Sequence, residues 1–452
     1  MAKHLPMKHS LILFLLFLAS KLFGAEPQQS ADKLISAATN STFAFERLTV
    51  LCDKFGPRFS GSTNLEMSID WILSEMKKDG LENVRGEDVM VPHWVRGNES
   101  IEMLQPRPHK MPMLGLGGSV ATPPEGITAE VLVVKSFADL SNRTAEAKGK
   151  IVLFNQPFTK YSETVLIRSR GAMHAAQAGA VASLIRSVTP FSMQTPHTGN
   201  MRYTNSLPKI PHAAITVEDA ELLQRMSDRG EKIIVCLKME AKTLPDAKSR
   251  NVIGEIVGRE KPEEIVLVSG HIDSWDLGQG AMDDAGGCVA AWEAVRLMHK
   301  MGMRPRRTIR VVLWTNEENG IAGAKTYRDA HKKELANHVL AIEADDGVFK
   351  PTAFAFSGSD AATKQVNEAA KLLQKITPMQ IKSGAGGADI SQLESDGVPL
   401  MDLIVDPTKY FWYHHTAADT MEVIDRNDFN RCVAALAVMS YAIADAPEKL
   451  AR

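Results

Sequence analysis

The chain has 452 residues, of which 44% are hydrophobic and 23% are charged. This composition is that of a globular protein, and the length predicts two or three domains, because it exceeds what one simple core can hold. The formal net charge is −2 and no long basic block occurs, so the sequence indicates no nucleic-acid-binding surface and no polybasic membrane patch.

Residues 1–25 have the pattern of a secretory signal peptide. Lys3 and Lys8 precede an apolar run at 11–18, and the small residues Gly24 and Ala25 follow it. The run is shorter than the ~20 apolar residues that a membrane-spanning helix needs. We therefore expect cleavage near Ala25 and a secreted or otherwise extracytoplasmic protein (extracellular, lysosomal or periplasmic, depending on the host) that has no membrane anchor after cleavage.

The cysteines and glycosylation triplets fit this compartment without defining a site. The four cysteines are Cys52, Cys236, Cys288 and Cys432, and none forms a CxxC pair. Their spacing describes neither a disulfide framework nor a thiolate zinc site, so we expect buried free thiols, with one bridge as the alternative. The triplets that begin at Asn40, Asn98 and Asn142 are glycosylation acceptors in a eukaryotic host.

In the first part of the chain the residue pattern changes from helical to β-rich near residue 106. Residues 42–81 have the apolar spacing of helices around a turn, "FGPRFSGS". Short β-rich runs follow, "AEVLVV", "GKIVLF" and "KIPHAAIT", with an amphipathic helical stretch at 171–182. This pattern predicts an inserted β-rich domain at 107–247, between an N-terminal part of the main domain at 26–106 and its larger part at 248–452. "KTLPDAKSR" is expected to be the connection back into the main domain.

The last part of the chain alternates strands with helices. Apolar runs at "NVIGEIVG", "EEIVLVSG", "RTIRVVLWT", "NHVLAIEAD" and "GVPLMDLIV" are separated by helical segments such as 285–301 and 360–373. Near-continuous apolar strands between helices predict an α/β fold, with a mainly parallel mixed sheet that has helices on both faces. In such sheets ligands bind at the carboxyl ends of the strands.

Acidic and histidine side chains gather at these predicted strand ends and in two loops. In chain order they are His271, Asp273, Asp283, Asp284, Glu317, Glu318, Asp345, Asp346, His414 and His415. A single His-x-Asp or Glu-Glu is more often a surface pair or a solvated turn. Together, however, these groups would crowd one cleft, and packed carboxylates repel one another unless cations bind between them. The sequence therefore predicts a metal site.

The ligand types indicate which metal and which chemistry. Imidazole and carboxylate ligands suit zinc, and manganese or cobalt less well. Five or more ligands indicate two ions that share a carboxylate, and two ions about 3.5–4 Å apart can hold a shared hydroxide and polarise a carbonyl oxygen. That arrangement suits amide hydrolysis, with one carboxylate outside the metal shell to carry the proton. These residues alone do not decide between Glu317 and Glu318, or between His414 and His415.

The motifs also carry a family resemblance. "GHIDSWDLGQGAMDDAGG", "WTNEENG", "IEADDG" and "HHTAADT" resemble, in this order, the co-catalytic two-zinc aminopeptidases and carboxypeptidases. The similarity to the carboxypeptidase branch continues through "GPRFSGS", "VPHWVRG", "TPPEGITAEVLVV" and "KYFWYHH", which covers nearly the whole mature chain. It implies a zinc exopeptidase fold with an inserted protease-associated-like domain.

The resemblance assigns the roles that the residues alone leave open. The ligand set that it implies for two zinc ions per chain is His271 and Asp345 on one ion, Glu318 and His415 on the other, and Asp283 as the bridge. Glu317 becomes the general base, and Asp273 is expected to orient His271. The resemblance also implies a cis peptide bond between Asp283 and Asp284.

The activity implied is that of a secreted zinc-dependent exopeptidase that hydrolyses dipeptides or short peptides with free termini, and the carboxypeptidase branch is homodimeric. Tyr410, Tyr413 and the loop 383–387 are candidate walls of the cleft, although aromatic packing is the competing role for both tyrosines. Three alternatives remain: an aminopeptidase acting on longer peptides, a single-zinc enzyme such as a glutaminyl cyclase, and a catalytically inactive binding or receptor homologue.

Overall fold

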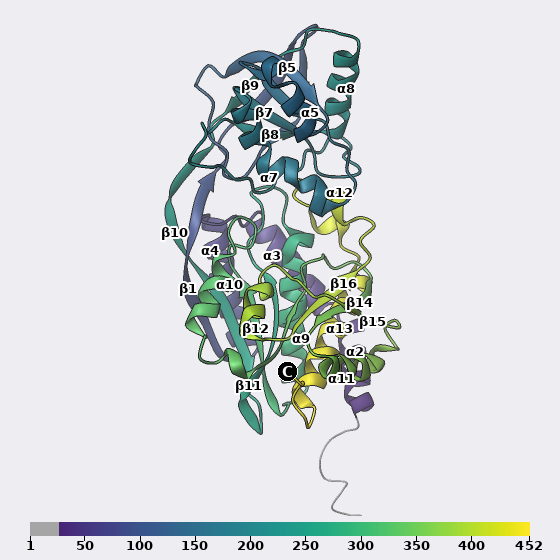
Figure 1. Ribbon diagram of the computed structural model, residues 1–452. Coiled ribbons are helices and arrows are strands. Elements are labelled where there is room, and N and C mark those ends of the chain that lie inside the picture. Colours follow the sequence, from purple (N-terminus) through teal and green to yellow (C-terminus); the bar gives the residue numbers. More distant parts are fainter. Residues whose placement is uncertain (1–26) are drawn as a thin grey trace, which may run out of the picture.

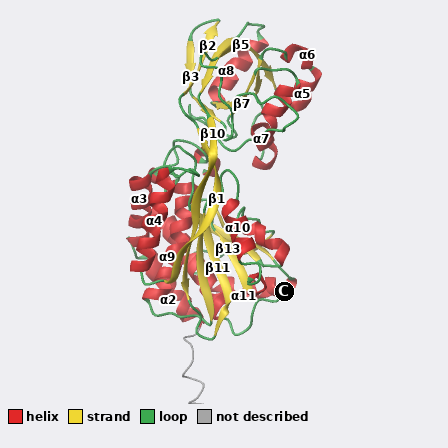
Figure 2. Cartoon of the chain, turned by 90° about the vertical axis from the view of Figure 1, so that its left-hand side faces the viewer, coloured by secondary structure: helices red, strands yellow, loops and turns green. Residues whose placement is uncertain are grey.

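The computed structural model describes residues 27–452, so the predicted signal peptide at 1–25 lies outside the described part. A larger and a smaller unit are stacked end to end and joined by a long two-stranded ribbon (Figures 1 and 2). Each unit is built on its own eight-stranded sheet. The chain passes from the larger unit into the smaller one and returns.

The larger unit contains a mixed sheet in the order β1-β10-β12-β11-β13-β16-β14-β15. Its strands are β1 (Glu82–Val95), β10 (Lys242–Ile256), β11 (Lys261–His271), β12 (Arg307–Trp314), β13 (His338–Glu343), β14 (Pro351–Ser357), β15 (Gln380–Ser383) and β16 (Leu400–Val405). The four central strands β12, β11, β13 and β16 are parallel to one another. The pairs β1–β10, β10–β12 and β14–β16 are antiparallel, whereas β15 pairs parallel with β14. The predicted α/β fold with a mainly parallel mixed sheet is confirmed.

Helices cover both faces of this sheet. One face carries α2 (Pro27–Thr39), α3 (Phe43–Phe55), α4 (Thr63–Lys78), α9 (Gly286–Lys300) and α13 (Arg426–Asp445). The other carries α10 (Ala322–Ala330) and the short helices η3 (Leu335–Asn337) and η5 (Ile390–Asp396). Because side chains alternate along a strand, Val266 and Val268 of β11 pack on the first set, whereas Ile265 and Leu267 pack on the second.

Three further helical segments complete the larger unit at its C-terminal side. α11 (Asp360–Ala370) continues into η4 (Lys371–Leu373) and packs against α13, and η6 (Met421–Val423) precedes α13. The turn predicted at "FGPRFSGS" is confirmed, since α3 ends at Phe55 and α4 begins at Thr63. Ser62 caps α4, because its hydroxyl accepts a hydrogen bond from the Leu65 N–H at 3.2 Å.

The ribbon between the units is made of β1 and β10. Their antiparallel register runs from Glu82 opposite Glu255 to Val95 opposite Lys242. The segment "KTLPDAKSR", expected as a connection, is therefore the first half of a strand. It pairs with β1 on both sides of an irregularity between Leu244 and Ala247, and Figure 2 shows this ribbon leading from the larger sheet to the smaller unit.

The smaller unit has a sheet in the order β3-β2-β9-β5-β6-β7-β8-β4. Its strands are β2 (Glu99–Gln105), β3 (His109–Met111), β4 (Met113–Gly115), β5 (Ile127–Val134), β6 (Ile151–Phe154), β7 (Ala182–Arg186), β8 (His212–Ile215) and β9 (Ile234–Met239). Its helices are α5 (Phe137–Asn142), α6 (Thr144–Ala147), α7 (Tyr161–Gln177) and α8 (Val217–Asp228). Since β2 belongs to this sheet, we propose that the inserted unit begins near residue 96, ahead of the expected boundary at 107.

Two further expectations can be compared with residues 27–452. Within that range no helix is long and apolar enough to cross a membrane. All four cysteines are free, as expected, and Cys52, Cys288 and Cys432 are buried.

One edge of the large sheet faces the small unit. The parallel strands β11, β12, β13 and β16 all end at this edge, because parallel strands share their carboxyl side. Beyond β16 the chain forms the short helix α12 (Tyr410–Tyr413), which lies beside α7 of the small unit (Figure 1). The Tyr161 ring of α7 stacks on the Phe411 ring of α12 with centroids 5.0 Å apart.

Candidate metal centre

The strand ends assemble a first group of ligand-type side chains. His271 is the last residue of β11, Asp345 follows β13, and Asp283 lies in the turn η2 (Ala281–Ala285) before α9. The His271 Nε2 atom is 3.1 Å from Asp283 Oδ1 and 3.0 Å from Asp345 Oδ1. Ligand atoms of all three lie within 4.8 Å of one another, so one ion could contact them together.

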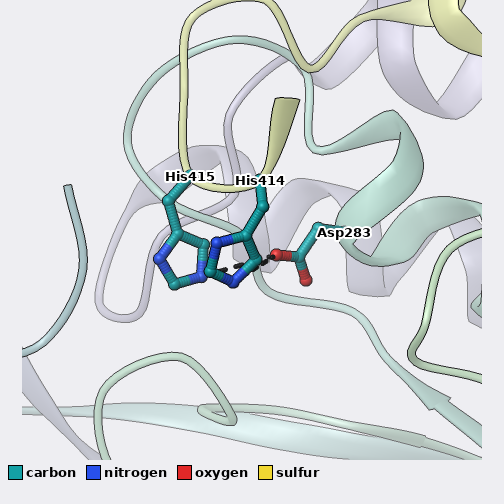
Figure 3. Close-up of side chains that lie close together, drawn as sticks. All are labelled: Asp283, His414 and His415. Carbon is teal, nitrogen blue, oxygen red and sulfur yellow. Dashed lines mark ion pairs between the residues drawn. The ribbon is translucent and has the colours of Figure 1, made fainter. Parts of the chain in front are cut away.

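Asp283 also belongs to a second group. Its Oδ2 atom is 3.4 Å from His415 Nε2 and 3.8 Å from His414 Nε2, and Figure 3 shows both imidazoles facing this carboxylate. The two rings stack with centroids 3.5 Å apart. Of the two histidines, His415 also approaches the Glu318 carboxylate, at 3.0 Å. Asp283 thus stands between two groups, as a bridging ligand must.

The loop that carries Asp283 is fixed by neighbouring carboxylates. The peptide bond between Asp283 and Asp284 is cis, as expected. Asp419 accepts the N–H groups of Met282 and Asp283 at 2.7 and 3.2 Å, while Asp284 accepts the N–H of His271 at 3.0 Å. The side chains of Asp284 and Asp419 therefore fix the main chain at His271, Met282 and Asp283 through hydrogen bonds.

The motif "FGPRFSGS" supplies a second support. The Arg58 side chain is fully buried and donates to four carbonyl oxygens, those of Gly56, Ile272, Gln279 and Gly280, at 2.7–3.0 Å. These acceptors bracket the loop between β11 and η2. The Arg58 guanidinium thus joins the turn between α3 and α4 to both ends of the loop that runs from His271 to Asp283.

Asp273 lies next to His271 but acts differently from the expectation. His271 Nδ1 donates to the Asp273 main-chain oxygen at 2.9 Å, whereas the Asp273 carboxylate is 3.8 Å away. That carboxylate accepts the N–H groups of Glu317 and Glu318 at 3.0 and 3.3 Å instead. The Asp273 main chain therefore orients the His271 imidazole, while the Asp273 carboxylate is hydrogen-bonded to the turn that carries Glu317 and Glu318.

The site concentrates negative charge away from water. Burial raises the pKa of Glu317 to about 8, with His271 opposing and Asp345 adding to the effect. Burial together with Asp283 raises the pKa of Glu318 well above its usual range. For Asp283 burial works upward, yet the hydrogen bond from His271 and the charge of His414 leave its pKa lowered.

Unpartnered oxygens show that these residues fit a metal ion. Within the described residues, the buried Glu318 Oε1 makes no hydrogen bond, and neither does Asp283 Oδ2, although it faces His415. Buried carboxylate oxygens without partners are unfavourable unless a cation binds them. Imidazole nitrogens and carboxylate oxygens together form the donor set that zinc takes.

The inserted unit reaches this site through residues that the sequence patterns did not single out. His197 Nδ1 donates to the His414 carbonyl at 2.8 Å, and the Thr198 N–H donates to the His415 carbonyl at 3.0 Å. His415 has a left-handed φ of +60°, a conformation that costs a non-glycine residue about 1–3 kcal/mol and persists where its surroundings enforce it. Both contacts come from the segment "PHTG" at residues 196–199.

The candidate wall residues lie at different distances from the ligands. The Tyr410 hydroxyl is 3.5 Å from the Asp345 carbonyl, and its ring is 5.1 Å from the His414 ring. Tyr413 packs against the hydrophobic core of the large unit. In the loop 383–387, the Gly386 and Gly387 N–H groups donate to Asp402. Both tyrosines therefore pack against this core, and Tyr410 also adjoins the site.

Comparisons with known proteins agree with this geometry. The profile of peptidase family M28 matches residues 251–440. Carboxypeptidase Q of Bos taurus and of Homo sapiens are each 52% identical to the chain over 409 residues, covering 90% of it and 87% of each relative.

Solved structures lead to the same group. A crystal structure of a peptidase M28 precursor from Shewanella amazonensis SB2B superimposes with a TM-score of 0.91 at 34% identity, covering 94% of this chain and 98% of that one. The zinc aminopeptidase BSAP from Bacillus subtilis shares the fold, with a TM-score of 0.68 at 23% identity over 90% of this chain and 98% of that one. The chain belongs to peptidase family M28, together with carboxypeptidase Q, and is a metallopeptidase.

Proposed function

We propose that the chain is a secreted exopeptidase that binds two zinc ions and hydrolyses dipeptides or other short peptides with free termini. The observation that carries the proposal is the position of Asp283. Its two carboxylate oxygens face separate groups, His271 on one side at 3.1 Å and His415 on the other at 3.4 Å. A carboxylate shared in this way is the usual centre of a two-metal hydrolase.

The assignment of ligands follows the same geometry. His271 and Asp345 would complete one zinc site, and Glu318 and His415 the other. His415 is preferred to His414 because its Nε2 atom approaches both Glu318 and Asp283. When bound, zinc lowers the pKa of water and polarises a carbonyl oxygen.

The protein's own groups would move the proton. Glu317 would accept a proton from the attacking water and pass it to the leaving amine. The Asp273 carboxylate accepts the N–H groups of both Glu317 and Glu318, and these hydrogen bonds fix the turn that carries the two side chains. Glu318 can then serve the metal while Glu317 stays free for the substrate.

The choice of exopeptidase class rests on the relatives. Those at 52% identity are carboxypeptidases by name, whereas the more distant B. subtilis protein is an aminopeptidase. The inserted unit contacts the ligand-bearing loop at His414 and His415, which supports restricted access to the cleft. Short substrates are therefore favoured over long chains.

A product screen tests this proposal. Unblocked dipeptides, N-blocked dipeptides and aminoacyl amides are each incubated with zinc-loaded protein, and the released amino acids are quantified. We expect rapid cleavage of unblocked dipeptides. Preferential cleavage of aminoacyl amides would indicate an aminopeptidase, and folded protein that binds no zinc and cleaves none of the three would indicate an inactive homologue.

The remaining features of the proposal have simple tests. N-terminal sequencing of the exported protein should begin near residue 26. Light scattering should give the mass of a homodimer. Asn40, Asn98 and Asn142 are all exposed, so a eukaryotic host should glycosylate them, and treatment with a glycosidase should lower the apparent mass.

A further inference from the structure

Arg96 is the first residue after β1, at the point where the ribbon enters the inserted unit. It belongs to the motif "VPHWVRG", none of whose residues is part of the candidate metal centre. Its side chain is only 11% exposed. Asp276 lies opposite it, in the loop of the large unit that connects β11 to η2. The two side chains form a bidentate ion pair, with the Arg96 Nε atom 2.8 Å from Oδ2 and the Nη2 atom 2.6 Å from Oδ1.

This pair joins the two units of the chain. Among the described residues, it is the only ion pair that connects 96–241 to the rest of the protein. A bidentate pair of a guanidinium and a carboxylate fixes direction as well as distance. The preceding residue, Trp275, adds an apolar contact, because Gly117 of the inserted unit lies so close to its ring that a Cβ atom would clash. The loop at 275–276 therefore contacts the inserted unit through both a ring and a charge.

Arg96 also contacts the segment of the inserted unit that reaches the metal centre. Its Nη1 atom donates to the Gly115 carbonyl, and its Nη2 atom is 3.4 Å from the Thr198 hydroxyl oxygen. The Thr198 hydroxyl donates to the same Gly115 carbonyl at 2.9 Å. The Thr198 N–H in turn donates to the His415 carbonyl at 3.0 Å. A continuous series of contacts therefore runs from Arg96 through Thr198 to His415.

His415 depends on such support more than His271 does. Its φ of +60° is left-handed, and a non-glycine residue keeps this conformation only where its neighbours enforce it. His271 ends a central strand of the large sheet, and the loop after it is held by Arg58 of the same unit. The first group of ligands thus needs only the large unit, whereas the second is also held by the inserted unit.

We propose that Arg96 is a positioning residue for the metal centre. Through its ion pair with Asp276 and its contact with Thr198, it sets the position of the His415 main chain. The inference rests on the proposed two-zinc site and deepens it, because it makes one zinc site depend on the contact between the two units. Replacing a residue that supports a metal ligand from outside the coordination shell typically changes metal affinity by roughly 10–100-fold.

The test is a zinc titration of metal-free protein against a competing chelator of known affinity. It compares wild type with Arg96→Met, Asp276→Asn and the double variant. Asp276→Asn keeps the size of the side chain, so it remains informative if Arg96→Met impairs folding. The matched control is Arg250→Met, since Arg250 lies on the ribbon and its partners Glu66 and Asp70, at 3.0 and 2.8 Å, belong to α4 of the large unit.

Wild-type protein should bind two zinc ions, and Arg250→Met should match it. Arg96→Met should bind one ion with wild-type affinity and the other roughly 10–100-fold more weakly. Asp276→Asn should weaken the same ion, and the double variant should be no weaker than Arg96→Met, because both substitutions break one pair. Excess zinc should restore turnover of a dipeptide by Arg96→Met, since mass action fills the weakened site.

Two results would overturn the role of Arg96. One is wild-type affinity for both zinc ions in Arg96→Met and Asp276→Asn. The other is an equal weakening of both ions, which would make the pair a general support of the two units. Both leave the proposed function standing. That function fails if folded wild-type protein binds fewer than two zinc ions, and the role of Arg96 fails with it. If zinc-loaded wild-type protein cleaves no peptide, the exopeptidase proposal fails, whereas the titration still decides the role of Arg96.

Discussion

Replacing Glu317 with glutamine separates proton transfer from metal binding. Gln keeps the size of the side chain and the N–H that donates to Asp273 at 3.0 Å. It removes the carboxylate that would take the proton from water. The candidate ligands Asp283, Glu318 and His415 keep their mutual contacts, so the variant should bind zinc as wild type does.

The size of the effect follows from the role. General-base catalysis typically contributes 10²–10⁴-fold, which corresponds to roughly 3–5 kcal/mol of transition-state stabilisation. Glu317→Gln should therefore lower kcat on a dipeptide by 10²–10⁴-fold with little change in KM. The neighbouring Glu318→Gln replaces a candidate ligand, and it should lose zinc as well as activity.

The assay combines steady-state kinetics with metal analysis on both variants. Turnover of Glu317→Gln close to that of wild type would refute the assignment of the base. So would loss of zinc from Glu317→Gln with retention in Glu318→Gln, because the two glutamates would then have exchanged roles.

The Glu317→Gln variant also tests how the buried Glu317 carboxyl affects the stability of the metal-free protein. Burial raises the pKa of Glu317 from 4.5 to about 8, so the folded state holds this proton more tightly than the unfolded state. Its contribution to stability therefore falls as pH rises from about 4.5 to about 8. Glutamine does not titrate, so after EDTA treatment Glu317→Gln should gain stability relative to wild type between pH 5 and pH 8. An equal difference in unfolding free energy at both pH values would contradict this reasoning.

Three further substitutions and one control probe a candidate ligand and the residues around the site. Asp283→Ala should lose both zinc ions, measured by mass spectrometry, because its carboxylate faces both ligand groups; one ion retained at full occupancy would argue against a bridge. Arg58→Met should lower the unfolding free energy in urea by about 3–5 kcal/mol, since it orphans four carbonyl oxygens, and a loss below about 1 kcal/mol would contradict that count. Gly287→Ala should disrupt the site, because a Cβ there would lie 1.9 Å from the Ala344 carbonyl, whereas Gly386→Ala meets nothing within 4 Å and should leave the melting temperature unchanged.

The sequence by itself determined the architecture of the large unit and the residues that gather there. Apolar runs such as "EEIVLVSG" and "RTIRVVLWT" predict buried parallel strands, and the topology of such sheets brings their carboxyl ends to one edge. His271 is the last residue of β11, and Glu318 and Asp345 follow β12 and β13. Their proximity could therefore be predicted without any knowledge of distances.

The residue types alone did not distinguish between neighbours in the chain. The family resemblance implied His415 rather than His414, and the tertiary structure supplies a contact that favours the same choice. His414 and His415 are adjacent in sequence, and the approach of His415 to Glu318 depends on a left-handed backbone and on contacts from Thr198. Asp273 orients His271 through its main chain, which side-chain spacing cannot reveal.

The contribution of the inserted unit was likewise beyond the sequence. Thr198 and His415 are separated by 217 positions in the chain, and no periodicity links residues on different units. The β1–β10 ribbon and the packing of α7 on α12 set their distance. Local patterns report which face of an element is buried, whereas the approach of two units is decided by contacts that form only when both have folded.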